Sequence, residues 1–162
     1  MMKTLTASTA GALLLLAFAS PSRANDNVSW ETIIGIAQAT NVVGGITGGG
    51  QPWSALGGSV AVNLGEGSVA FQVRGLVLAG GNAIGTPDGV TSVVGTLVCG
   101  LNSATPQIIN TSPVPLSPQG DAAFHGSFNS STGGCIGTQQ AFLIRATSGA
   151  WIANGAVRVV FP

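Results

Sequence analysis

The segment SVAVNLGEGSVAFQVR, residues 59–74, contains two runs of alternating apolar and polar residues on either side of a glycine-rich turn. Successive side chains of a β-strand point to opposite faces, so alternation with a period of two indicates a half-buried strand. When the two runs are paired, the Val, Leu and Phe side chains share one face and the Ser, Asn, Gln and Arg side chains lie on the other. The segment therefore predicts an antiparallel hairpin with one core face and one solvent face.

The turn of this hairpin has two interpretations. A two-residue turn at Glu66-Gly67 pairs Leu64 with Val69 and brings every apolar residue opposite another one. A turn at Gly65-Glu66 preserves the same faces, whereas a three-residue loop would mix them. The faces are therefore predicted, and the choice between the two turns stays open.

The remainder of the chain has the same strand-like character. Runs rich in Val, Ile, Thr and Phe are interrupted by Gly, Pro and Asn, and no stretch has the period of an amphipathic helix. Short strands separated by turns indicate an all-β fold, a single-domain antiparallel β-sandwich of about seven or eight strands over residues 25–162. The glycine-rich stretch 44–50 is expected to form a mobile loop. The predicted strands cover residues 29–38, 58–64, 68–78, 91–99, 106–111, 121–128, 140–146 and 150–160.

Residues 1–24 have the three-part pattern of a secretory signal peptide. Lys3 precedes an uncharged apolar stretch at 10–19, and the small residues Ser22 and Ala24 follow it. The apolar stretch is about ten residues long, whereas a membrane-spanning helix needs about 20. We therefore expect cleavage after Ala24, no membrane span in the mature chain, and a secreted, periplasmic or cell-surface location.

The mature chain is almost free of charge. It has no lysine, and three arginines face five carboxylates, which gives a net charge of −2. A nucleic-acid partner is excluded because phosphate binding needs clustered Lys and Arg. A hydrophobic content of 45% excludes a disordered chain. Weak charge repulsion between copies leaves self-association open.

The two cysteines, Cys99 and Cys135, follow the predicted signal peptide. An even number of cysteines in an exported chain favours a disulfide. Closing a loop of this length stabilises the folded state by about 3 to 4 kcal/mol in the chain-entropy account. A redox or metal-binding role is disfavoured because the close C-x-x-C spacing is missing, and we expect a structural bond.

Candidate catalytic residues are sparse. His125, the only histidine, follows Asp121 by four residues, and on an extended strand two such residues lie about 13 Å apart, too far for an acid–base pair. The sequence lacks a G-x-S-x-G nucleophile motif, a phosphate-binding loop and a metal-ligand pattern. We therefore assign no catalytic residue, no metal and no cofactor, and the enzymatic status stays open with a preference for a non-enzyme.

The candidate ligand-binding residues are Trp53, Trp151 and Arg145. Aromatic rings stack on sugars in many secreted modules, and Trp53 lies in loop-like surroundings beside Gln51. A three-residue loop after residue 146 would place Arg145 opposite Trp151 and permit a cation–π contact, whereas a two-residue loop would put Trp151 in the core. The exposure of Trp151 stays open.

Several short stretches resemble small secreted bacterial β-rich proteins that carry no assigned activity. The resemblance lies in residues 95–99 (GTLVC), 113–117 (PVPLS), 120–122 (GDA), 142–145 (FLIR) and 151–155 (WIANG), and it spans most of the mature chain. It implies export and a β-rich domain, but it supplies no site residue.

Three classes of function are compatible with these features. The first is an exported, non-enzymatic β-sandwich domain that binds a neutral ligand, either a glycan or a protein, at the cell surface or in the periplasm. The second is a structural or self-assembling envelope protein, because the weakly charged surface and strand edges favour pairing. The third, which is least favoured, is a hydrolase that uses His125.

Overall fold

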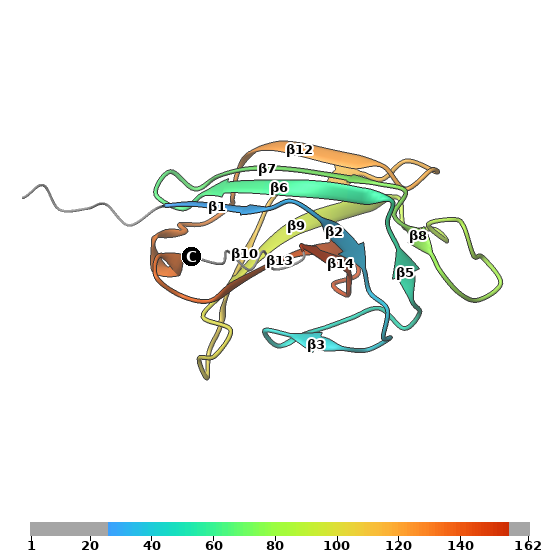
Figure 1. The fold of residues 1–162 in the computed structure, drawn as a ribbon, viewed down its shortest axis with the longest axis horizontal. Helices are drawn as coiled ribbons and strands as arrows, with labels where there is room; N and C mark the ends of the chain where they lie inside the picture. Colours follow the sequence, from blue (N-terminus) through green and yellow to red (C-terminus); the bar gives the residue numbers. More distant parts are fainter. Residues whose placement is uncertain (1–25, 156–162) are drawn as a thin grey trace, which may run out of the picture.

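A computed structural model describes residues 26–155 of the chain. The predicted signal peptide lies outside these residues, as does the part of the last predicted strand beyond Gly155. The described part is an antiparallel β-sandwich with no α-helix and a single 3-10 turn, η1 (Gly133–Cys135) (Figure 1). None of its helical segments is long and apolar enough to cross a membrane. The predicted all-β fold class is confirmed.

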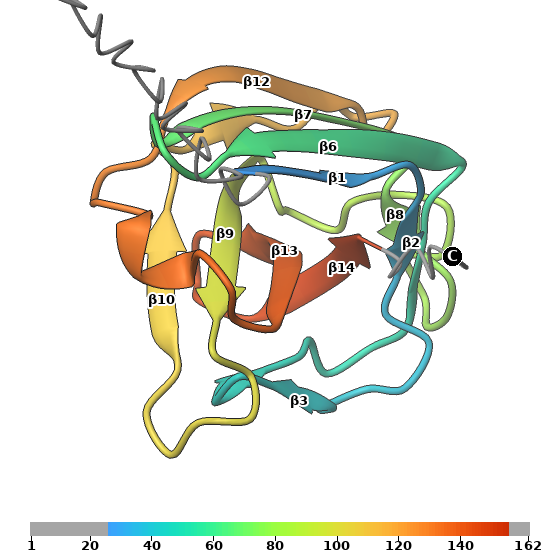
Figure 2. The same ribbon diagram turned by 60° about the vertical axis from the view of Figure 1, so that its left-hand side comes forward.

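Two sheets form the sandwich, and they lie one above the other in Figures 1 and 2. Sheet A has the order β1 (Asn27–Trp30), β6 (Gly57–Asn63), β7 (Ser68–Arg74) and β12 (Ala122–Ser127). Sheet B has the order β10 (Gln107–Asn110), β9 (Ser92–Cys99), β13 (Gln140–Ala146), β14 (Trp151–Gly155) and β2 (Ile33–Gly35), and β11 (Val114–Pro115) also pairs with β9. Two short ribbons are added, β3 (Val42–Val43) with β4 (Ile46–Thr47), and β5 (Trp53–Ser54) with β8 (Val77–Leu78).

Two of the predicted strands are divided in the structure. The segment 29–38 becomes β1 and β2, which belong to different sheets, and the segment 68–78 becomes β7 and β8. The second break occurs at Gly75, whose φ of 61° is a left-handed conformation that favours glycine. The carboxylate of Asp121 accepts a hydrogen bond from the Gly75 amide at 2.9 Å and holds this break. The structure therefore has more and shorter strands than expected.

The β6–β7 hairpin has the predicted faces, with its Val and Phe side chains in the core. Asn63 pairs with Ser68 and encloses a four-residue turn, 64–67. The side-chain oxygen of Asn63 accepts a hydrogen bond from the Glu66 amide at 2.9 Å, and its carbonyl oxygen accepts one from Gly67 at 2.8 Å. Of the two turns that the alternation allows, the one at Gly65-Glu66 has the observed register.

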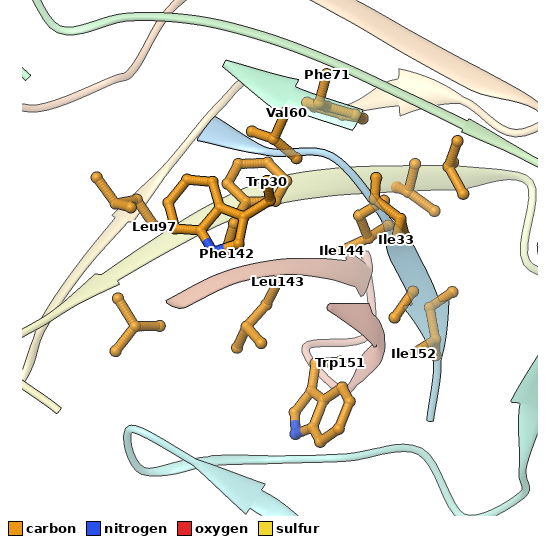
Figure 3. Packing of buried hydrophobic residues seen from close by; sticks show 14 of the residues in the cluster. Trp30, Ile33, Val60, Phe71, Leu97, Phe142, Leu143, Ile144, Trp151 and Ile152 are labelled. Atoms are coloured by element: carbon orange, nitrogen blue, oxygen red, sulfur yellow. The ribbon is translucent and has the colours of Figure 1, made fainter. Parts of the chain in front are cut away.

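The main core fills the space between the two sheets (Figure 3). The ring of Phe142 on β13 packs against Phe71 of sheet A at 5.5 Å between centroids and against Trp30 at 5.9 Å. Gly95 on β9 makes this packing possible, because a Cβ atom at that position would lie 2.6 Å from the Phe71 ring. The aromatic cluster therefore depends on a glycine in a central strand.

Cys99 and Cys135 form the predicted disulfide, with Cα atoms 5.1 Å apart. Cys99 ends the central strand β9, and Cys135 ends η1 in the connection between the sheets. Both residues are buried, with exposed fractions of 2% and 0%. The bond ties an irregular segment to the most heavily paired strand of sheet B.

A third layer covers part of the outer face of sheet B. The glycine-rich stretch 44–50 was expected to be a mobile loop, but part of it forms the β3–β4 hairpin, which lies against sheet B on the side away from sheet A (Figures 1 and 2). Gly44 and Gly45 have φ values of 54° and 81°, as a two-residue hairpin turn requires. Ile46 of this hairpin is buried. The covered outer face explains why consecutive residues of β9, β13 and β14 are buried.

Candidate functional site

Trp53 lies in a strand and not in the loop that its sequence surroundings suggest. It pairs with Leu78 in the β5–β8 ribbon, and its amide donates to the carbonyl oxygen of Ile36 at 2.8 Å. Gly35 of β2 lies so close that a Cβ atom there would overlap the Trp53 carbonyl group. The exposed fraction of Trp53 is only 7%, so its ring face is not an open stacking platform.

Trp53 lines a hollow of about 350 Å³, which we call the Trp53 pocket. The residues around it come from the 49–51 loop, the β5–β8 ribbon, the 88–90 turn, and the β13–β14 hairpin. Three exposed polar residues and three less exposed apolar residues are among those that line it. The polar ones are Gln51, Asp88 and Ser148, and the apolar ones are Leu78, Val90 and Ile152.

The indole N–H of Trp53 has no acceptor within residues 26–155. In the same part of the chain, every fully buried side-chain nitrogen or oxygen has a hydrogen-bond partner. The Nε1 atom of Trp53 must therefore reach solvent, and the Trp53 pocket is the hollow that this side chain lines. Nε1 is also near Gly49, since a Cβ atom at Gly49 would lie 3.6 Å from it. A donor without a partner therefore lies on a buried ring beside Gly49, which also lines the pocket.

Trp151 is buried and packs within the fold, so its role there is structural. It lies on the outer face of sheet B and points away from the main core, toward the β3–β4 layer (Figure 3). Its Nε1 donates to the carbonyl oxygen of Asn41 at 3.0 Å, and its ring lies against Gly48, where a Cβ atom would be 3.2 Å away. With an exposed fraction of 3%, its surface is already covered by the chain itself.

Arg145 is the cross-strand partner of Trp151, as the three-residue loop predicted. The two side chains nevertheless contact different groups. The Nε of Arg145 donates to the carbonyl oxygen of Gly149 at 2.8 Å, and its Nη1 donates to the side-chain oxygen of Asn110 at 3.4 Å. Partial burial lowers the pKa of Arg145, because desolvation disfavours its charged form. Ring contacts in the described part of the chain do not include Trp151, and the cation–π contact that the three-residue loop would permit is not observed there.

Arg145 lines a second hollow of about 300 Å³, which we call the Arg145 pocket. Asn110, Asn129 and Thr147 contribute polar side chains to its lining. The turn at residues 146–150 separates it from the Trp53 pocket, and Ala146 borders both hollows. Two of the three predicted ligand-binding residues therefore line pockets on either side of one turn, while the third is buried beneath the β3–β4 layer.

The outer face of sheet A carries the largest hollows among those described, of about 510 Å³ and 440 Å³. They share the small residues Ser29, Ala61 and Ala70. His125 and Glu66 line one end, and no exposed aromatic ring lies on this face in the described strands. These hollows are broad depressions over small side chains, and they offer fewer fixed anchors than the Trp53 pocket does.

The described residues contain no cluster of three or more His, Cys, Asp or Glu side chains that could hold a metal ion. His125 is exposed on β12, and the Asp121 carboxylate is used by the Gly75 amide. The geometry thus offers exposed hydrogen-bonding groups and apolar surface for recognition, and it builds no nucleophile–base pair around the candidate residues.

Sequence reasoning did not identify Asn110, Asn129 or Ser148 as lining residues. Asn110 lies 35 residues from Arg145 in sequence, and only the pairing of β10 and β13 on either side of β9 brings them together. No local pattern reports such a contact. Gln51 also lines the Trp53 pocket, but the sequence used it only as a sign of loop-like surroundings for Trp53 and did not predict it as a site residue.

Comparisons of the chain with protein-family models, with curated proteins and with solved structures found no match.

Proposed function

We propose that this protein is an exported, non-enzymatic β-sandwich domain that binds a neutral ligand in the Trp53 pocket. A glycan is the ligand class that suits the pocket best, because sugars present hydroxyl groups for hydrogen bonds and C–H faces for apolar contact. The location would be the periplasm, the cell surface or the medium. The Cys99–Cys135 disulfide supports such an oxidising compartment.

The observation that carries the proposal is the unused indole N–H of Trp53 at the edge of a small amphipathic pocket. Buried indole donors usually find an acceptor, and one that opens into a hollow can be satisfied by a ligand oxygen. The buried ring fixes the direction of this donor, so little conformational entropy is lost when a ligand binds.

The surrounding side chains complete a pattern suited to hydroxyl groups. Gln51 and Ser148 each offer donor and acceptor atoms, and Asp88 offers a carboxylate acceptor. Leu78 and Ile152 supply apolar surface next to the indole ring. The proposed mode is edge recognition through Nε1, and it replaces the stacking on an open ring that the sequence suggested.

Trp53→Phe is the sharpest test, because it removes the N–H group and preserves a buried aromatic ring. Wild type is screened on an array of neutral glycans, and the best ligand is titrated by calorimetry. Loss of one hydrogen bond should weaken binding about three- to ten-fold. Gln51→Ala should also weaken binding, while Gln72→Ala, on the outer face of sheet A, serves as the matched control.

Equal affinity of wild type and a folded Trp53→Phe variant would place the binding site elsewhere. Absence of any ligand on the array would reject neutral-glycan binding. A glycan whose binding is abolished by Gln72→Ala and not by Gln51→Ala would move the site to sheet A.

A second candidate function, self-assembly, is favoured by the edge strand β12. In the described part of sheet A, β12 pairs with β7 alone, and its outer-face residues Ala123 and His125 are exposed. The strand carries neither lysine nor proline, the residues that commonly protect an edge from pairing with a second copy. Sizing by light scattering across a hundred-fold concentration range should show association, and Ala123→Lys should prevent it. A monomer at every concentration excludes this candidate.

A further inference from the structure

We infer that the Arg145 pocket is a separate site for a carboxylate, and that its ligand class is an acidic sugar of the uronate type. It lies on the outer face of sheet B, across the 146–150 turn from the Trp53 pocket. The inference is independent of the neutral ligand proposed for that pocket.

The first argument concerns charge. Arg145 is half-buried, and both of its hydrogen-bond acceptors are neutral: the Gly149 carbonyl and the Asn110 side-chain oxygen. The lining of the pocket contains no acidic side chain, and the described part of the chain holds no ion pair of Arg145. A partly desolvated guanidinium without a counter-charge is costly, and an anionic ligand would remove that cost.

The second argument concerns the donors that are left. Nε and Nη1 each make one hydrogen bond, and Nη2 has no acceptor within residues 26–155. Nη1 therefore keeps one N–H group and Nη2 keeps two for the planar, two-bond contact that carboxylates make with arginine. A phosphate or sulfate dianion fits less well, because one guanidinium supplies a single positive charge.

The third argument identifies the remainder of the ligand. The side chain of Thr147 has no hydrogen-bond partner among the described residues, and Asn129 has a free amide group next to its contact with Ser112. These groups suit sugar hydroxyls. A volume of about 300 Å³ accommodates one sugar ring and leaves little space for a longer chain.

The test is a titration of the purified protein with sodium galacturonate, followed by the NMR resonance of the Arg145 Nε–H group. Galacturonate should shift this resonance and not that of Arg74, and neutral galactose should shift neither. N-acetylglycine, which carries a peptide-type carboxylate, should bind more weakly than galacturonate. Trp53→Phe should leave galacturonate binding unchanged.

Two variants separate binding from folding. Arg145→Gln should weaken galacturonate binding about ten-fold or more, while the exposed control Arg74→Gln should not change it. Asn110→Asp preserves the shape and the acceptor atom of Asn110, and it supplies a built-in carboxylate that should occupy the guanidinium. This variant should fold as wild type does and lose galacturonate binding.

Three results would overturn the inference. Equal affinities for galactose and galacturonate would show that the carboxylate does not contribute to binding. Binding of N-acetylglycine as tight as that of galacturonate would reject the sugar as the ligand class. Unchanged galacturonate affinity in folded Asn110→Asp would show that the guanidinium does not hold the ligand.

Discussion

Trp151 donates its indole N–H to the carbonyl oxygen of Asn41 at 3.0 Å, across 110 residues of sequence. This hydrogen bond fastens the covering layer to the outer face of sheet B. The amide of Gly49 donates to the Trp151 carbonyl oxygen at 2.9 Å and adds a backbone contact beside it. The layer is therefore held by the same residue through its side chain and its backbone.

Trp151→Phe should destabilise the protein by about 1 to 3 kcal/mol, because it leaves the Asn41 carbonyl without its donor and leaves space beside Gly48. The free energy of unfolding in urea measures this loss. The exposed residue Ile84 offers a control, and Ile84→Ala should stay within about 0.5 kcal/mol of wild type. A Trp151→Phe variant as stable as wild type would show that the hydrogen bond does not hold the layer.

Gly95→Ala should destabilise the fold by about 1 to 3 kcal/mol, the usual cost of overpacking a core. The new methyl group would lie 2.6 Å from the Phe71 ring and 2.8 Å from the Phe142 ring. Gly50→Ala is the matched control, because a Cβ atom there meets no other atom within 4 Å. Thermal unfolding should separate the two variants clearly, and equal melting temperatures would contradict the packing described for the aromatic cluster.

Replacing both cysteines by serine should lower the free energy of unfolding by about 2 to 5 kcal/mol. Cys99 and Cys135 are buried, so the serine hydroxyls add a desolvation cost to the loss of the cross-link. Reduction of wild type with dithiothreitol in urea provides the comparison, since it opens the cross-link without changing the sequence. A double variant that matches oxidised wild type would show that the bond adds no stability.

His125→Ala should change both stability and ligand affinity by no more than about 0.5 kcal/mol. The side chain is exposed on the outer face of sheet A, on the far side of the sandwich from the proposed pockets. Calorimetric titration of the variant with the best glycan ligand checks affinity. A hydrolytic turnover in wild type that disappears in a folded His125→Ala variant would instead establish the hydrolase.

Local alternation was sufficient to predict the faces of β6 and β7, because the Val, Leu and Phe residues of 59–74 recur at every second position, and the observed pairs Val60–Phe71 and Val62–Val69 keep them on one face. The alternation did not determine the turn, since a shift of two residues in the pairing register keeps every side chain on the same face. There the side chain of Asn63, through its hydrogen bond to the Glu66 amide, favours one register. A hydrogen bond between a side chain and the backbone has no periodic signature.

The covering layer and the burial of Trp53 were beyond prediction for a different reason. β5 pairs with β8 across the whole β6–β7 hairpin, and two-residue strands are too short to show periodicity. The glycines of the Gly44-Gly45 turn suggested flexibility by composition, because no local pattern shows that Gly44 packs closely against Val98 of sheet B. Cysteine pairing was predictable because only two cysteines exist in the chain.

The two sheets should also differ in how readily their amide protons exchange with solvent. Strand β9 has paired neighbours on both sides, is covered on one face by sheet A and lies within a sheet whose other face carries the β3–β4 layer. Its amides can exchange only when the sandwich opens as a whole, so they should report the global free energy of unfolding. Within the described residues, strand β12 has one unpaired edge and an uncovered outer face, and its outward amides should exchange through local fraying. The molecule thus has a slow-exchanging centre in the covered sheet and a fast-exchanging margin in the bare one.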